Sequence, residues 1–134
     1  MDFTKKIAAT NSGNHFMIHN HMRLTQMEQD CAVVELFVQE ESQNLFGSIH
    51  GGVFLTMADC AAGGAARSAG KKYVTLSSSF AFIRNTKDGH ILARAKVRSR
   101  GRTICVVAVE ITDGTETLLA SGTFTMFATG ELED

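Results

Sequence analysis

The chain has 134 residues, which predicts a single domain spanning residues 1–134 and large enough to bury an ordinary hydrophobic core. Hydrophobic residues make up 44% and charged residues 20% of the chain, as in soluble globular proteins. The net charge of -1 offers no general attraction to nucleic acid or to an anionic membrane, so an anionic ligand must be met by local charge.

The three cysteines, Cys31, Cys60 and Cys105, are odd in number and widely separated, which favours free thiols in a reducing compartment. Residues 1–15 lack the apolar segment of a signal peptide. Residues 42–58 carry no formal charge but contain too many polar side chains for a membrane span. We therefore expect a cytoplasmic protein.

In chain order, the pattern predicts a short helix over residues 3–9, a β-hairpin, a loop over residues 42–50, and a helix over residues 51–69 that ends at Gly70. Four further segments rich in β-forming residues follow, and turn residues connect them in the manner of antiparallel hairpins. The predicted strands cover residues 21–29, 31–39, 73–85, 91–100, 103–112 and 118–128.

This order predicts an α+β fold in which the last four strands form a meander. The helix is rich in Ala and Gly, so a strongly curved sheet could approach it closely from several sides. A small sheet also has edges to cover, and pairing of edge strands in a dimer is the simplest way to do so.

Residues 44–52 read Asn-Leu-Phe-Gly-Ser-Ile-His-Gly-Gly and place an amide, an imidazole and two glycines just before the central helix. The first acid after them is Asp59, which lies among apolar and small residues. Burial of an unpaired carboxylate costs several kcal/mol as a rough figure, so Asp59 is predicted to take part in chemistry or to have a strong internal partner.

With this motif and this order of elements, the chain resembles the hotdog-fold thioesterases, and most closely the PaaI-type acyl-CoA thioesterases. The resemblance covers about residues 20–128. It implies a curved antiparallel β-sheet wrapped around one long central helix, and homodimers that often pair into homotetramers. It also implies hydrolysis of an acyl-CoA thioester without metal or another cofactor, coenzyme A entering as part of the substrate.

Matching positions carry the family's roles over to this chain. Asp59 would be the nucleophile or the general base, and the Gly51 backbone amide would polarise the thioester carbonyl. Asn44 and His50 would shape and orient the site. This chemistry suits a helix N-terminus, whose free N–H groups can bind the tetrahedral oxyanion. The sequence leaves both roles of Asp59 open.

The family also has a hydroxyl residue on the first strand after the helix. The alignment gives Thr75 or Ser77, which lie on one face of a regular strand, and does not decide between them. One departure from the family pattern is Asn85, which stands where a proline usually follows this strand.

The basic turn near residue 101 matches a segment that contacts the nucleotide end of coenzyme A in relatives. Three arginines within residues 98–102 would suit a phosphate-bearing ligand, since a guanidinium donates bidentate hydrogen bonds. The residues predicted to bind coenzyme A are Arg84, Arg100, Gly101, Arg102 and Thr103.

Gly51 and Asp59 lie eight positions apart, about 12 Å along a helix, which is too far for both to act on one carbonyl. We therefore expect each active site of a dimer to combine Gly51 of one chain with Asp59 of the other.

Two other functions stay open at this point. A non-catalytic hotdog module that binds acyl-CoA is one, although retention of Asp59 argues against it. A hotdog hydratase or dehydratase is the other, but those relatives use a proline-containing context that this proline-free chain lacks. His15, His19 and His21 have no fourth ligand at a convincing spacing, so no metal site is predicted.

Overall fold

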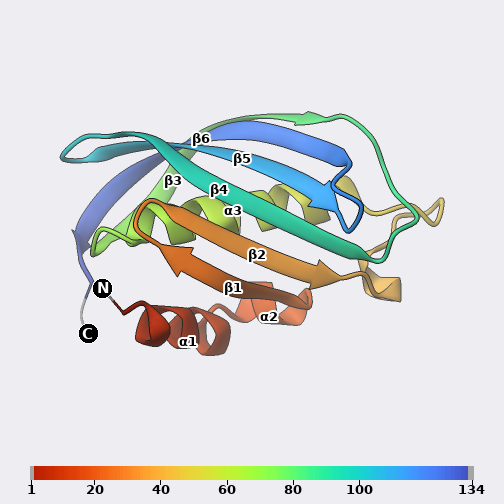
Figure 1. Cartoon of the computed structure of the whole chain (residues 1–134), viewed down its shortest axis with the longest axis horizontal. Coiled ribbons are helices and arrows are strands. Elements are labelled where there is room, and N and C mark those ends of the chain that lie inside the picture. Colours follow the sequence, from red (N-terminus) through yellow and green to blue (C-terminus); the bar gives the residue numbers. More distant parts are fainter. Residues whose placement is uncertain (1, 133–134) are drawn as a thin grey trace.

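One long helix, α3 (Gly51–Arg67), lies in the hollow of a curved six-stranded antiparallel sheet in the computed structural model, which describes residues 2–132 (Figure 1). This arrangement confirms the predicted α+β fold with a central helix. The other elements are α1 (Thr4–Gly13), α2 (His15–His19), β1 (Met22–Glu28), β2 (Cys31–Phe37), a short 3-10 turn (Glu40–Ser42), β3 (Lys71–Phe82), β4 (His90–Arg100), β5 (Ile104–Asp113) and β6 (Leu118–Glu131).

Small residues on α3 allow the sheet to approach it closely. A Cβ atom on Gly64 would lie 3.0 Å from the Cβ of Ala32 on β2 and 3.4 Å from a methyl carbon of Leu24 on β1. Ala58, Ala61, Ala62, Ala65 and Ala66 of the helix are fully buried. The Ala and Gly content of this segment is therefore a packing requirement of the curved sheet.

The strands lie in the order β1-β2-β4-β5-β6-β3, so the predicted four-stranded meander is wrong. Only β4, β5 and β6 form a meander, and β3 pairs with β6 at the far edge of the sheet. The connection over residues 83–89 is a crossover. The turn-forming residues of this connection make one local hydrogen bond, in which Asp88 Oδ1 accepts from the His90 N–H at 3.0 Å. They make another to the end of β5, where Thr86 Oγ1 donates to Asp113 at 2.8 Å.

The two edges of the sheet differ. The Asn11 side chain on α1 donates to the Leu24 carbonyl and accepts from the Leu24 N–H, both at 2.8 Å, so α1 covers the β1 edge. At the other edge, β3 is exposed along most of its length, and Leu76 and Phe82 are each 57% exposed. An open, apolar strand edge is suited to pairing with another strand.

Helix α2 and the longer extent of α1 are differences from the sequence prediction, which placed a helix only over residues 3–9. Within residues 2–132, no helix is long and apolar enough to span a membrane, and no group of three His, Cys, Asp or Glu side chains could hold a metal ion.

Candidate active site

The N-terminus of α3 leaves one backbone donor open. His50 is the N-cap residue, and its Nδ1 accepts a hydrogen bond from the Gly52 N–H at 2.8 Å. This contact places the ring proton of a neutral His50 on Nε2. The Gly51 N–H has no acceptor among residues 2–132. It is therefore free to bind an incoming oxygen at the positive end of the helix dipole.

Asn44 shapes the loop that leads to this helix end. Its Oδ1 accepts from the backbone N–H groups of Phe46 at 2.9 Å and Ser48 at 3.1 Å, and its own N–H donates to the Ser48 carbonyl at 2.7 Å. In this chain Asn44 therefore stabilises the conformation of the loop, and its predicted role in orienting the substrate stays a prediction.

Asn85 fastens the same loop to the end of β3. Its Nδ2 donates to the Ile49 carbonyl at 3.0 Å, and its Oδ1 accepts from the Ile49 N–H at 3.2 Å. The sequence identified Asn85 only as a departure from the family's proline. Its amide pairs with both backbone groups of a residue just before His50, so it fixes where α3 begins.

A cavity of about 300 Å³ opens beside Gly51. Phe82 forms part of its wall, and its ring carbon would lie 3.4 Å from a Cβ on Gly51. Arg84 lines the cavity as well, so the structure brings this predicted coenzyme A ligand next to the predicted oxyanion donor. The remaining lining residues are Ile49, Phe54, Ile83 and Asn85.

Asp59 lies half-buried more than two turns further along α3. Its Oδ1 accepts a hydrogen bond from Thr75 Oγ1 on β3 at 2.5 Å. The Thr75 hydroxyl therefore fixes the orientation of the carboxylate. No hydrogen bond links Asp59 to Ser77 within residues 2–132.

A β-bulge explains why Thr75 and Ser77 are not equivalent. Thr75 stands opposite Met126 of β6, whereas Ser77 stands opposite Thr125, with the register shift at Leu76. Residues opposite each other share a face of the sheet and successive residues alternate, so Thr75 and Ser77 point to opposite faces. The expectation that they share one face is wrong, because it assumed a regular strand.

Cys60, the neighbour of Asp59, is not a competing nucleophile. Burial, followed by the negative charge of Asp59, raises the pKa of the Cys60 thiol to about 11. The thiol therefore stays protonated at neutral pH, whereas the thiolate is the reactive form.

Arg100 has a different role from the one expected. Its Nε and Nη2 donate to Asp30 at 3.1 and 2.8 Å, its Nη groups donate to the Ala65 and Ala66 carbonyls at 3.1 and 3.0 Å, and Nη1 also donates to the Tyr73 hydroxyl at 3.0 Å. All five donors are therefore engaged within the chain. Arg100 caps the C-terminus of α3 and has no donor left for a phosphate.

The rest of the predicted coenzyme A segment, Gly101, Arg102 and Thr103, is exposed in the turn between β4 and β5. Lys71 donates to the Arg102 carbonyl at 2.8 Å, which ties this turn to the start of β3. In Figure 1 the turn and the loop before α3 lie at opposite ends of the molecule. Within one chain it is therefore remote from Gly51 and Arg84.

Residues 46–120 match the family model described as the thioesterase superfamily. The chain belongs to the thioesterase superfamily. The matched region contains Gly51, Asp59 and Thr75. Its match to the thioesterase superfamily confirms the hotdog fold expected from the sequence.

Several solved structures are similar to this chain. The smu.793 protein of Streptococcus mutans, bound to acetyl CoA, is 33% identical, with 84% of this chain and 91% of that one covered and a TM-score of 0.79. A hypothetical thioesterase from Streptococcus pneumoniae with coenzyme A is 31% identical, covering 92% and 99% of the two chains, with a TM-score of 0.84. The PaaI protein of the E. coli phenylacetic acid degradation operon is 25% identical, covering 95% and 94%, with a TM-score of 0.88.

Two further structures of the Streptococcus pneumoniae protein are alanine mutants, one at an aspartate and one at a threonine. Those two positions are 16 apart in its sequence. Asp59 and Thr75 are also 16 apart and share a hydrogen bond. The related protein has thus been altered at a pair of residues with the same identities and the same spacing.

Proposed function

We propose that this protein hydrolyses acyl-CoA thioesters at active sites that two copies of the chain share. The observation that carries the proposal is the placement of an unoccupied backbone donor, Gly51, and a carboxylate fixed by a hydroxyl, Asp59, on one helix. They are about 12 Å apart along its axis, so neither can complete the site of its own chain.

The geometry of β3 supports the shared site. Thr75 bonds to Asp59 near the middle of the strand, and Phe82 packs against Gly51 at its end. If the open edges of two β3 strands pair antiparallel with Thr75 opposite Phe82, the bulge at Leu76 leaves three paired positions on either side of Ser79, so the twofold axis passes between Ser79 and its copy in the partner chain. That register brings Asp59 of each chain toward Gly51 of its partner and covers the exposed apolar side chains of the strand.

The chemistry then follows from the two groups. The Gly51 N–H binds the carbonyl oxygen as negative charge develops on it. Asp59 either attacks the carbonyl carbon, giving an anhydride that water cleaves, or takes a proton from an attacking water. In both routes the C–S bond breaks, the thiolate of coenzyme A is protonated, and the acid is released. Thr75 holds one carboxylate oxygen, which leaves Oδ2 to act.

We propose coenzyme A as the thiol part of the substrate, because two similar structures contain acetyl CoA or coenzyme A. Arg84 lines the same cavity as Gly51, so it can contact the part of coenzyme A that lies in this cavity. We assign contact with the nucleotide to Arg102 in the exposed turn, together with Gly101 and Thr103, whereas Arg100 is excluded by its internal bonds.

The direct test is release of free coenzyme A from a panel of acyl-CoA thioesters by the parent and by Asp59→Asn. We expect the variant to keep its fold and to lose about 100-fold or more in kcat and kcat/KM, as for loss of a general base. Glu110→Gln, an exposed acid on β5, is the matched control.

A folded Asp59→Asn protein with turnover near that of the parent would refute the assignment. A parent protein that binds acyl-CoA but releases no coenzyme A would instead support the non-catalytic binding module.

A further inference from the structure

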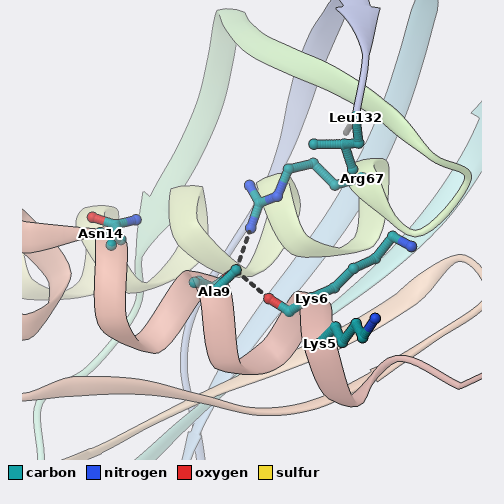
Figure 2. A pocket seen from close by; sticks show the side chains of 8 residues that line it. Lys5, Lys6, Ala9, Asn14, Arg67 and Leu132 are labelled. Carbon is teal, nitrogen blue, oxygen red and sulfur yellow. Dashed lines mark hydrogen bonds between the residues drawn. The ribbon is translucent and has the colours of Figure 1, made fainter. Parts of the chain in front are cut away.

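A second cavity, of about 380 Å³, lies between α1 and the C-terminal half of α3 (Figure 2). Lys5, Lys6, Thr10 and Asn14 line it from the N-terminal segment, and Arg67 lines it from α3. Leu132 and small residues of α1 complete the wall. Three cationic side chains therefore surround one cavity, and none of the lining residues within 2–132 is acidic.

Arg67 has no ionic partner within residues 2–132. Its one hydrogen bond in that part of the chain runs from Nη2 to Thr10 Oγ1 at 3.3 Å, and Figure 2 shows the side chain reaching from α3 toward α1. Burial lowers the pKa of Arg67, yet an arginine remains charged at neutral pH. A largely buried cation is costly unless an anion pairs with it.

The position of this cation is set by Gly63. A Cβ on Gly63 would lie only 2.8 Å from Arg67 Nη1, so the guanidinium occupies the space that a side chain would take. Asp59, Gly63 and Arg67 follow each other at intervals of four, so they lie along one face of α3. The guanidinium therefore lies about one turn, roughly 6 Å along the axis, beyond Asp59.

One lining residue of the cavity also lies near the turn that carries Asp59. Asn14 lines the cavity and lies close enough to Cys60, the residue after Asp59, to lower the pKa of its thiol slightly against the larger effect of burial. An acyl group whose carbonyl is held at Asp59 can extend along this face of the helix and end at Arg67.

We propose that the cavity receives a carboxylate at the far end of the acyl group, so that the preferred substrates are short ω-carboxyacyl thioesters. The inference rests on the proposed function, because it takes the reacting carbonyl to lie at Asp59. A carboxylate can pair with the unused N–H groups of Arg67, and Lys5 and Lys6 add positive charge. A methyl-ended chain would leave this cation with no anionic partner from residues 2–132.

The experiment compares adipyl-CoA with hexanoyl-CoA, which differ in the charge at the far end. Arg67→Met keeps much of the side-chain volume and removes the charge. We expect the ratio of kcat/KM for adipyl-CoA to that for hexanoyl-CoA to fall about 10- to 100-fold, the effect of losing a charge-assisted hydrogen bond. Gly63→Ala should lower the same ratio, because its methyl group displaces the guanidinium.

Lys96→Gln removes an exposed cation from β4, outside the cavity, and should leave the ratio at the parent value. If Arg67→Met does not fold, Lys6→Gln tests the same cavity from α1, with a smaller expected fall of about 3-fold because Lys6 is only half-buried. If the folded cavity variants have the same ratio of kcat/KM for adipyl-CoA to that for hexanoyl-CoA as the parent, the inference is wrong.

Titration calorimetry on the Asp59→Asn protein separates this inference from the proposed function, since it needs no turnover. Tighter binding of adipyl-CoA than of hexanoyl-CoA, lost in the Asp59→Asn, Arg67→Met double variant, supports the inference even if the parent hydrolyses neither ester. Equal binding of the two esters contradicts it. Binding of free adipate that depends on Arg67, without any preference between the esters, identifies a separate effector site and also contradicts it.

Discussion

The two ends of α3 meet the same physical problem in opposite ways. At the C-terminus, the Ala65 and Ala66 carbonyls accept hydrogen bonds from Arg100, and the Ser68 hydroxyl donates to Ala65 at 2.7 Å. At the N-terminus, His50 satisfies the Gly52 N–H, and the Gly51 N–H has no acceptor within residues 2–132. The C-terminal carbonyls are thus satisfied within the chain, which stabilises the helix, whereas the N-terminus leaves one N–H donor unpaired among residues 2–132, and we propose that a ligand uses it.

The comparison can be broken most strongly at Gly51. His50 has φ -63° and ψ 135°, which suits a residue before proline, and the first helical position tolerates proline because its N–H is unpaired. Gly51→Pro should therefore keep the helix and remove the donor. We expect kcat for acyl-CoA hydrolysis to fall about 100- to 1000-fold, as for loss of one oxyanion donor.

Gly51→Ala is the matched control, because it keeps the N–H and its methyl group would lie 3.4 Å from Phe82, an ordinary contact. It should retain most of the activity, and circular dichroism should show equal helix content in both variants. Equal kcat values for the proline and alanine variants would mean that the Gly51 N–H is not the oxyanion donor.

The opposite end can be broken at Arg100. Arg100→Met removes the hydrogen bonds to Asp30 and to the helix carbonyls, and we expect the free energy of unfolding to fall by about 2 kcal/mol. The KM for acyl-CoA should stay within about twofold of the parent value, a change of less than 0.5 kcal/mol. Urea denaturation and steady-state kinetics measure the two effects.

Arg98→Met provides the comparison variant, since Arg98 is exposed and makes no hydrogen bond within residues 2–132. It should leave stability nearly unchanged. A large rise in KM with little loss of stability in Arg100→Met would restore Arg100 to the coenzyme A site.

A smaller change sharpens the description of the open end. His50→Ala removes the side-chain acceptor for the Gly52 N–H and should lower the free energy of unfolding by about 1 kcal/mol. His50→Asn supplies another capping oxygen and should recover most of that loss. If His50 also donates a proton in catalysis, His50→Asn would restore stability without restoring kcat, a result that contradicts a positioning role.

Local patterns were sufficient to predict much of this molecule. The β1–β2 hairpin, the central helix and the position of Asp59 within it follow from β-propensity, small-residue content and the motif before Gly51. Expectations that needed long-range information were less successful. The pairing of β3 with β6 depends on how the sheet closes around α3, and turn residues near residue 88 cannot reveal it.

The same limit applies to single side chains. The bulge at Leu76, which separates Thr75 from Ser77, depends on the partner strand. The role of Arg100 depends on Asp30, which lies 70 positions away in sequence. Asn85 was noticed only because it replaced a proline, and its bonds to Ile49 require the fold to bring the two segments together.

The shared active site is most directly tested in a heterodimer of an Asp59→Asn chain and a Gly51→Pro chain, isolated through two different affinity tags. If each site combines Gly51 of one chain with Asp59 of the other, one site carries both lesions and the other carries neither. The account predicts activity near half that of the parent dimer. Activity no higher than that of either mutant homodimer would show that the two groups do not act across the interface.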